Sequence, residues 1–481
     1  MFAASCATVA GLVVCARPEA SDAQAIAIAD PPAIRVHPDH ERVARNPSLV
    51  RRMNVDGEIL FRTKFNRRDG AGRPSATGDS KPTPRSSLPQ ERFTRAAGPD
   101  ASSCASCHND PIPGGSGDFV TNVFVGAHFS DPPTLSFGRE VTNERNTTSI
   151  LGAGAIEMLA REMTADLRAQ RAQGGTRARA LQREERVVLV SKGVSFGTII
   201  ARTDGSYDQS ALEGVDDDLV VKPFGVKGIA VSLREFSIAA LNQHHGIEAT
   251  ERFDWHRTGV QDFDEDGVQD EFSIGQLSAL VLFQASLPPL QRAASAGVPT
   301  TRVSRGEKLF HASGCDSCHV PFLELEARTF SEPNPYNRPG TLSPSDVNGV
   351  IRVGLPTNRG VGGVQWSPTT LKVWAYSDLK RHRICDATEP FFCNETRRQD
   401  NVPTDEFITP KLWDLARSAP YGHRGDCDTL SEAIMHHAGE ATHSRVSYGL
   451  LPDSSKRDVI EFLLSLGAGT TPTPGNQGRV R

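Results

Sequence analysis

The pattern Cys-x-x-Cys-His occurs twice in this chain of 481 residues, first at Cys104–His108 and again at Cys315–His319. With nine cysteines and 14 histidines in the chain, one chance occurrence is expected only about 0.005 times. Two thiols at this spacing can add to the two vinyl groups of one porphyrin, and the next histidine can bind the iron. The sequence therefore predicts two covalently bound c-type haems. The predicted attachment residues are Cys104, Cys107, Cys315 and Cys318, and the predicted iron ligands are His108 and His319.

Zinc binding and thiol redox chemistry are the other common uses of a Cys-x-x-Cys pair. A zinc site usually gathers its ligands from pairs tens of residues apart, whereas these two pairs are about 210 residues apart. A thioredoxin-like pair requires a strand-to-helix setting in a βαβ unit, which neither motif has. Covalent haem is therefore the favoured interpretation.

Residues 1–25 are predicted to be an export signal. The stretch from Phe2 to Ala16 is small and apolar, and Ala23 to Ala25 has the small-x-small form of a cleavage site, but no Lys or Arg precedes it. A disordered start is the alternative interpretation. Because covalent haem attachment takes place outside the cytoplasm, we expect a periplasmic or secreted protein.

Charge and hydropathy exclude two kinds of partner. The chain has 53 Lys and Arg against 58 Asp and Glu, so it lacks the basic excess that would neutralise nucleic-acid phosphates. No run of apolar residues approaches 18, so no transmembrane segment is expected.

Three cysteines lie outside both the motifs and the predicted signal. Cys385 and Cys393 either close a short disulfide loop in an oxidising compartment or remain thiols, and Cys427 is left over. The sequence leaves both states open.

The spacing of apolar residues predicts a mainly α fold with long loops and little β structure. Pro288 and Pro289 end one of the expected helices, and 42 Gly and 32 Pro indicate extensive loops. We expect two haem domains, at residues 40–290 and 300–470. The expected helices cover residues 150–173, 232–245, 273–287, 305–312, 430–437 and 456–466.

Several segments are similar to a known family. They are GEKLF, GCDSCHVP, FSEPNPYNRPG, AYSDL, TPKLWDLARSAPYGHRG, TLSEAIMHHAGEA and IEFLLSLG, all between residues 305 and 467. Together they resemble the di-haem oxidoreductase family, which is related to bacterial di-haem cytochrome c peroxidases and MauG. The resemblance implies two cytochrome c-like domains with neighbouring haems, one passing electrons and one meeting the substrate.

The resemblance also implies a second axial ligand for the C-terminal haem. In the peroxidases, a Met fourteen residues after the His of the PY-x-H-x-G segment binds that iron. The same count from His423 ends at His437, so the second haem is expected to be held by His319 and His437. Met435 and His436 are rivals within one turn, and a surface histidine is the plain alternative. Histidine in place of Met should lower the reduction potential.

A peroxidase needs a group that moves a proton between the two peroxide oxygens beside an open iron position. The first haem, bound through His108, is expected to offer that position. By resemblance, Glu157 is the candidate catalytic residue, and a solvated Glu157–Arg161 pair is the alternative.

Other residues remain candidates without an assigned role. His128, His244 and His245 can be distal groups or sixth ligands of the first iron, or ordinary structural histidines. The tryptophans that can bridge two haems, or simply pack in a core, are Trp255, Trp366, Trp374 and Trp413.

Oxygen ligands alternate along residues 262–271, with Gly267 permitting a tight turn, as in an EF-hand-like calcium loop. The twelfth position is Ser273 rather than Glu, so the usual bidentate ligand is missing. An acidic turn without metal is the alternative. The candidate calcium ligands are Asp262, Asp264, Asp266, Asp270 and Glu271.

The resulting hypothesis is a periplasmic di-haem cytochrome c peroxidase-like oxidoreductase. It would reduce hydrogen peroxide at the N-terminal haem with electrons delivered through the C-terminal haem by a small cytochrome c or cupredoxin. The alternatives are a haem oxygenase that uses O2 on an organic substrate, and a non-catalytic electron-transfer protein. Oxidation of side chains on a partner protein is a variant of the first hypothesis.

Overall fold

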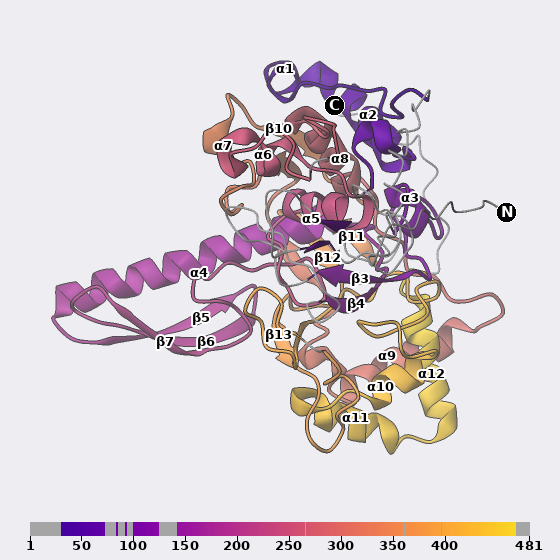
Figure 1. The fold of residues 1–481 in the computed structure, drawn as a ribbon. Helices are drawn as coiled ribbons and strands as arrows, with labels where there is room; N and C mark the ends of the chain where they lie inside the picture. Colours follow the sequence, from indigo (N-terminus) through magenta and orange to yellow (C-terminus); the bar gives the residue numbers. More distant parts are fainter. Residues whose placement is uncertain are drawn as a thin grey trace, which may run out of the picture. The chain divides into compact units, whose positions relative to one another are not determined.

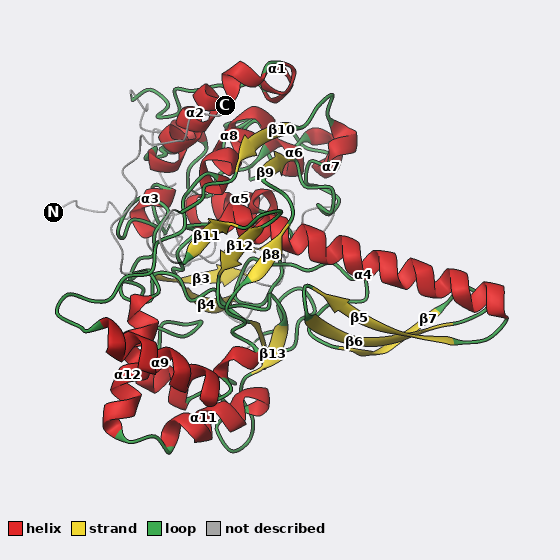
Figure 2. Ribbon diagram, turned by 180° about the vertical axis from the view of Figure 1, so that it is seen from behind, coloured by secondary structure: helices red, strands yellow, loops and turns green. Residues whose placement is uncertain are grey.

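Helices and short antiparallel sheets alternate along the chain, which is 36% helix and 17% strand (Figure 1; Figure 2). The fold is therefore mixed, and the mainly α class expected from the sequence is wrong in this respect. The computed structural model describes residues 30–72, 83–84, 92–93, 100–124, 142–264, 266–358, 362–395 and 397–467. The chain divides into two units, Met1–Pro31 and Pro32–Arg481, and every element below belongs to the second unit.

The main helices are α1 (His40–Arg45), α2 (Val50–Arg62), α3 (Cys104–Cys107), α4 (Ala153–Leu181), α5 (Leu233–Ala240), α6 (Thr250–Phe253), α7 (Trp255–Thr258), α8 (Ile274–Ala285), α9 (Thr300–Ala312), α10 (Leu430–Met435), α11 (Thr442–Gly449) and α12 (Asp453–Ser465). The strands are β1 (Thr83–Pro84), β2 (Arg92–Phe93), β3 (Val120–Phe124), β4 (Thr142–Asn146), β5 (Glu185–Ser191), β6 (Val194–Ala201), β7 (Tyr207–Leu212), β8 (Leu323–Leu325), β9 (Thr329–Glu332), β10 (Ile351–Gly354), β11 (Gly363–Trp366), β12 (Leu371–Trp374), β13 (Arg381–Arg383) and β14 (Glu406–Ile408). None of the described helices is both long enough and apolar enough to cross a lipid bilayer.

Helix starts follow side-chain caps that can be read in the sequence. Ser232 accepts a hydrogen bond from the Glu235 N–H at 3.1 Å at the start of α5, and Ser273 forms a reciprocal capping box with Gln276 at the start of α8. All six expected helices are present. The first begins at Ala153 and continues to Leu181, eight residues beyond its expected end at 173, and α9 begins at Thr300 instead of 305.

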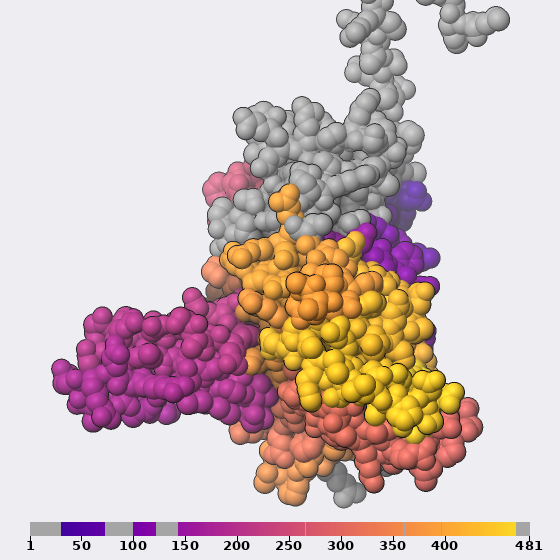
Figure 3. Space-filling model, turned by 90° about the horizontal axis from the view of Figure 1, so that it is seen from below, coloured from indigo at the N-terminus to yellow at the C-terminus, as the bar shows by residue number. Residues whose placement is uncertain are grey.

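The sheet of β5, β6 and β7 packs against α4, and together they form the magenta block in Figure 3. Strands β5 and β6 are joined by Lys192 and Gly193, which both have positive φ, 51° and 83°. Two such residues form the turn that suits the twist of a hairpin. Buried and exposed residues alternate along β5, so one face of the strand is buried. This hairpin is the largest element that the helical expectation missed.

Buried apolar residues form two main clusters. The larger cluster contains residues between Ile34 and Leu290. It also contains residues of the strands between Leu323 and Val373, and Trp413. The smaller joins α9, α10, α11 and α12 around Phe310, Tyr448 and Phe462. The segment carrying β8 to β12 thus packs with the N-terminal cluster, although it follows the second Cys-x-x-Cys-His motif in sequence.

Candidate functional site

The two Cys-x-x-Cys-His motifs adopt the same local turn. Cys104–Cys107 forms the single-turn helix α3, and the His108 N–H donates to the Cys104 carbonyl at 3.0 Å. Cys315–Ser317 forms the 3-10 helix η5, and the His319 N–H donates to the Cys315 carbonyl, also at 3.0 Å. None of these four cysteines forms a disulfide. Each turn thus brings two cysteines and the following imidazole together in one short segment, as covalent haem attachment requires.

The orientation of the His319 ring is fixed by a hydrogen bond. Its Nδ1 lies 2.9 Å from the Tyr376 carbonyl, which can only accept, so Nδ1 carries the proton and Nε2 keeps its lone pair. Burial lowers the pKa of His319 to about 4, so the ring is neutral at pH 7. A neutral imidazole with a free Nε2 is the form that binds iron.

His437 lies at the end of α10 close to His319, and its charge is one of the causes that lower the pKa of His319. Its Nδ1 donates to the Ala433 carbonyl at 2.7 Å, which leaves Nε2 unprotonated. The rivals are placed differently. His436 Nδ1 pairs with Glu389 at 3.1 Å, and Met435 is 42% exposed. Of these three residues, His437 is the one whose charge acts on His319, so it is the candidate placed beside that histidine.

The first motif has two histidines beside it, carried by the π-helix η4 (Leu241–His245) at the end of α5. His245 is buried, its Nδ1 donates to the Ala101 carbonyl at 2.7 Å, and its Nε2 lies 3.8 Å from Cys104 Sγ. His244 pairs with Asp100 at 3.0 Å. Burial lowers the pKa of both His108 and His245 to about 4. π-Helical turns are frequent at functional sites, so their occurrence here draws attention to His245. His128 lies outside the described residues.

Glu157 is buried within an ion pair. Its carboxylate accepts from Arg161 at 2.5 Å, from the Leu233 N–H at 2.8 Å and from Asn334 at 2.9 Å. The Glu157–Arg161 pair expected from the i, i+4 spacing is therefore present, but its side chains are only 0% and 7% exposed rather than solvated. Both carboxylate oxygens accept hydrogen bonds, so the carboxylate is stabilised in its ionised form as part of the ion pair.

Trp413 connects segments that belong to the two motifs. Its Nε1–H donates to the Trp374 carbonyl at 2.6 Å, and a Cβ added at Gly152 would lie only 2.4 Å from its ring. The other tryptophans are less central, since Trp255 and Trp366 are 57% and 58% exposed and Trp374 packs on Phe322.

Carboxylates converge in two overlapping groups, one of which includes Glu248, three residues after His245. Glu248, Asp264 and Glu271 are all buried, and one oxygen of each lies within 4.8 Å of the others. Asp262 and Asp266 join Asp264 in the second group. The pKa of Glu271 is raised by burial and by the negative charges of Glu248 and Asp264.

Glu271 Oε1 is buried without a hydrogen-bond partner among the described residues. Asp270 is exposed and belongs to neither group, whereas Glu248 was absent from the ligands expected from sequence. Glu248 comes from beyond the loop, three residues after His245, so loop spacing alone could not have identified it.

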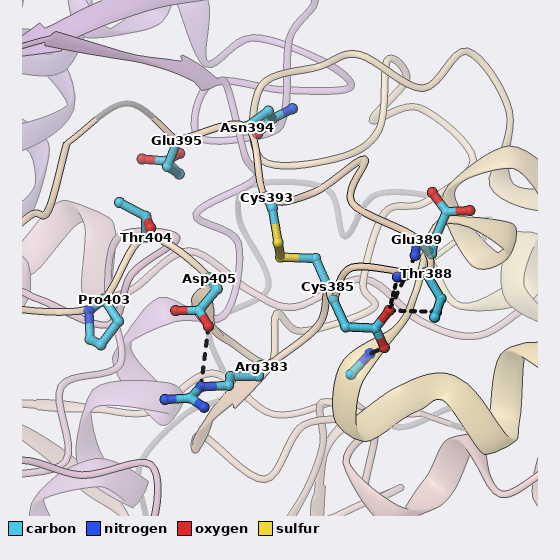
Figure 4. The surroundings of a disulfide bond; sticks show 12 residues. Arg383, Cys385, Thr388, Glu389, Cys393, Asn394, Glu395, Pro403, Thr404 and Asp405 are labelled. Atoms are coloured by element: carbon cyan, nitrogen blue, oxygen red, sulfur yellow. Dashed lines mark hydrogen bonds and ion pairs between the residues drawn. A yellow bond between two sulfur atoms is a disulfide. The ribbon is translucent and has the colours of Figure 1, made fainter.

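The cysteine pair left open by the sequence is a disulfide. Cys385 and Cys393 are bonded (Figure 4), with a Cα–Cα distance of 5.6 Å. Cys427 is a buried free thiol. This bond lies in the loop that precedes the His423 segment, close to α10.

Comparison with solved structures finds two distant similarities. A hydrazine synthase from Kuenenia stuttgartiensis is 15% identical. The match covers 94% of this chain and 100% of the hydrazine synthase chain, with a TM-score of 0.38. A MauG-like protein associated with microbial copper homeostasis, 16% identical, matches over 65% of this chain and 88% of its own with a TM-score of 0.24. No family model matches the chain, and no curated protein matches it. At these TM-scores the overlap is partial, so the chain's own residues carry the functional argument.

Proposed function

We propose that this protein is a di-haem c-type oxidoreductase, exported from the cytoplasm, that reduces hydrogen peroxide at the haem bound through His108. Electrons would be delivered through the haem bound through His319 by a small soluble cytochrome c or cupredoxin. The observation that carries the proposal is the pair of Cys-x-x-Cys-His turns, which share one local geometry. Bound haem supplies the iron at which peroxide is bound and reduced.

The surroundings of the second motif suit an electron-transfer centre. His319 and His437 are both partly buried, and each donates from Nδ1 to a backbone carbonyl, so each keeps Nε2 free. These two imidazoles would hold the second haem. If both ligate it, that haem would pass electrons without a position for substrate.

The chain provides a connection between the two proximal histidines. The Tyr376 carbonyl accepts from His319, and the nearby Trp374 carbonyl accepts from Trp413. The Trp413 ring contacts Gly152, the Ile150 N–H donates to the Gly114 carbonyl at 2.9 Å, and the Gly114 N–H donates to the His108 carbonyl at 3.0 Å. We therefore assign Trp413 as the aromatic residue through which electrons pass between the two sites.

His245 is the group best placed to handle protons at the first site. It is neutral at pH 7, and because Nδ1–H is used by the Ala101 carbonyl, Nε2 is the atom that accepts a proton. Glu157 is committed to its ion pair. We therefore place proton transfer at His245 and give Glu157 the role of holding the N-terminus of α5 through the Leu233 N–H.

A calcium ion at the carboxylate groups is part of the proposal. Buried carboxylates whose oxygens lie within 4.8 Å of one another repel unless they are protonated or share a cation, and oxygen-only ligands suit calcium. The proposed ligands are Glu248, Asp262, Asp264, Asp266 and Glu271.

The test is the electronic and EPR spectrum of the purified holoprotein, as isolated and half-reduced, with peroxide, cyanide or CO. A ligand-accessible haem beside a low-spin haem, together with peroxide turnover, would support the proposal. A stable complex with O2 but no peroxide turnover would favour an oxygenase. Two low-spin haems that bind none of these molecules in any redox state would overturn both enzyme functions and leave an electron carrier.

A further inference from the structure

The disulfide loop lies directly against the segment that carries His437. Cys385 and Cys393 are eight positions apart, and the bond closes the loop between them (Figure 4). After Cys393 the chain continues to Asn394, whose Oδ1 accepts from His423 Nε2 at 2.7 Å. One side of the loop thus meets the end of α10, and the other meets the segment of His423.

Backbone contacts join the loop to the residues that follow His437. The Ala438 N–H donates to the Ile384 carbonyl at 2.8 Å, and the Gly439 N–H donates to Asp386 Oδ2 at 3.0 Å. Gly439 has φ +55°, and a Cβ there would lie 2.5 Å from the Arg383 carbonyl oxygen. The two segments therefore approach so closely that a side chain at position 439 would separate them.

Two phenylalanines of the loop pack against the neighbouring histidines: Phe391 contacts His436, and Phe392 contacts His437 and also, with centroids 6.1 Å apart, His436. The Phe392 ring is 2% exposed and meets the His437 ring edge-on, with centroids 5.7 Å apart and an interplanar angle of 87°. The Phe391 ring stacks on His436 at 3.6 Å and 7°. Glu389, also in the loop, pairs with His436. The loop thus contacts His436 through Phe391 and Glu389, and it contacts His437 through Phe392.

The His437 ring is restrained from two directions. Its own helix holds Nδ1 at the Ala433 carbonyl, and Phe392 packs against the ring from the loop. Without the loop, only the hydrogen bond at the C-terminal end of a six-residue helix would orient the ring.

We propose that the loop closed by Cys385 and Cys393 is the positioning element for His437, with Phe392 as the residue that holds the imidazole at the iron of the second haem. The inference rests on the proposed function, in which His437 is the second axial ligand of that haem. The disulfide acts by keeping Phe392 and the Ile384 carbonyl in place together, because it restricts the conformations of the residues between the two cysteines.

The experiment uses the full-length holoprotein and its ferric EPR spectrum, with cyanide titration of the second haem. In Phe392→Ala and in the double variant Cys385→Ala/Cys393→Ala, we expect the low-spin signal of that haem to broaden or shift toward high spin. The cyanide concentration that displaces His437 should fall about 10-fold, as for loss of other groups that orient a ligand. Phe391→Ala is the matched control, since it removes an equal ring that contacts His436, and it should leave both measurements unchanged.

Three further variants keep the outcomes separate. His437→Ala tests the ligand itself: an unchanged second haem in this variant would overturn the assignment of His437 in the proposed function. If His437→Ala converts the haem while Phe392→Ala and the disulfide variant keep the wild-type EPR signal and cyanide affinity, the role of the loop is overturned and the ligand stands. Phe392→Leu should restore most of the signal by refilling the space. If Phe392→Ala fails to incorporate two haems, Phe392→Leu is measured in its place. Cys427→Ala is the control for the double cysteine variant, because it also removes a buried sulfur.

Discussion

The two Cys-x-x-Cys-His turns are alike in backbone but differ in how their histidines are held. His319 donates from Nδ1 to the Tyr376 carbonyl, whereas His108 Nδ1 is buried near Gly115 and makes no hydrogen bond of normal geometry with the described residues. Beyond each turn the contrast continues. His437 is supported by a disulfide loop, and His245 stands at the end of a π-helical turn.

This difference indicates a division of roles. A proximal histidine with a strong hydrogen bond has a fixed ring and a more basic Nε2, which favours a stable six-coordinate iron. A less restrained histidine permits the small displacements that accompany binding and release of a ligand. In the proposed function, the more firmly held His319 would belong to the electron-transfer haem, and His108 to the haem that reacts with peroxide.

Replacing the two histidines by alanine should separate these roles most strongly. In His108→Ala we expect peroxide turnover to fall by about 100-fold or more, because the group at which peroxide reacts is no longer held. In His319→Ala the first reaction with peroxide should remain fast in a single-turnover measurement. The steady-state rate should fall, because the second haem no longer delivers electrons. Haem content is the control for both. If His108→Ala keeps its peroxide turnover and His319→Ala loses the fast reaction, the roles are reversed. Peroxide would then react at the haem held by His319.

Glu157 tests whether the proton at the first site moves through a carboxylate. Glu157→Gln leaves Arg161 buried without its partner, so we expect the free energy of unfolding to drop by about 3–5 kcal/mol in a denaturant titration. The peroxide rate of the folded fraction should not change. A rate loss of about 10² to 10⁴ with little loss of stability would instead identify Glu157 as the proton shuttle. Glu58→Gln, in the exposed pair with Arg62, is the matched control and should cost under about 0.5 kcal/mol.

Calcium and pH should act on the first site and not on the second. Because the pKa of Glu271 is raised in the folded chain above its ordinary 4.5, the metal-free folded state keeps a proton that the unfolded state releases. The resulting stability is complete below pH 4.5 and is lost as pH rises toward the folded pKa, so metal-free protein should melt at a lower temperature at pH 8 than at pH 5.

Calcium at 100 times its Kd should add about 2.7 kcal/mol, with the larger gain at pH 8. Melting temperatures measured with calcium and with a chelator at both pH values check this. Glu271→Gln should remove both the pH dependence contributed by this group and most of the calcium effect. Equal melting temperatures with calcium and with chelator at both pH values would overturn the calcium site.

Trp413 lies between the two regions and should give the smallest change in stability. Trp413→Phe loses the hydrogen bond to the Trp374 carbonyl, which should cost about 1 kcal/mol, and keeps an aromatic ring against Gly152. Electron exchange between the haems, followed after rapid mixing of half-reduced protein, should slow. Trp366→Phe at an exposed position is the control. An unchanged exchange rate in Trp413→Phe would remove Trp413 from the path.

The sequence predicted those features that depend on neighbouring residues. The Cys-x-x-Cys-His motifs, the helices expected at 232–245 and 273–287 and the acidic loop at 262–271 all follow from residues a few positions apart. The hairpin of β5 and β6 was missed although Lys192-Gly193 lies between two apolar, β-branched stretches. The turn signal is local, but it follows directly on a long segment with helical periodicity.

Other features depend on residues far apart in the chain, and the sequence could not reveal them. Glu157 is buried because Asn334 and Leu233 cover it, and Glu248 joins the carboxylate loop from outside it. The contact of Trp413 with Gly152 joins positions that no spacing relates. These are products of tertiary packing, which amino-acid patterns do not encode directly.

The block formed by α4 and β5 to β7 also has a consequence for how this protein varies among its relatives. The chain leaves the body at Arg168 and returns at Asp218, where the Arg168 Nε donates to the Asp218 carbonyl at 3.0 Å. A segment whose two ends lie side by side can be lengthened, shortened or exchanged without moving the residues on either side. We therefore expect residues 169–217 to differ in length between related proteins. The packing of the residues on either side of this segment should be retained.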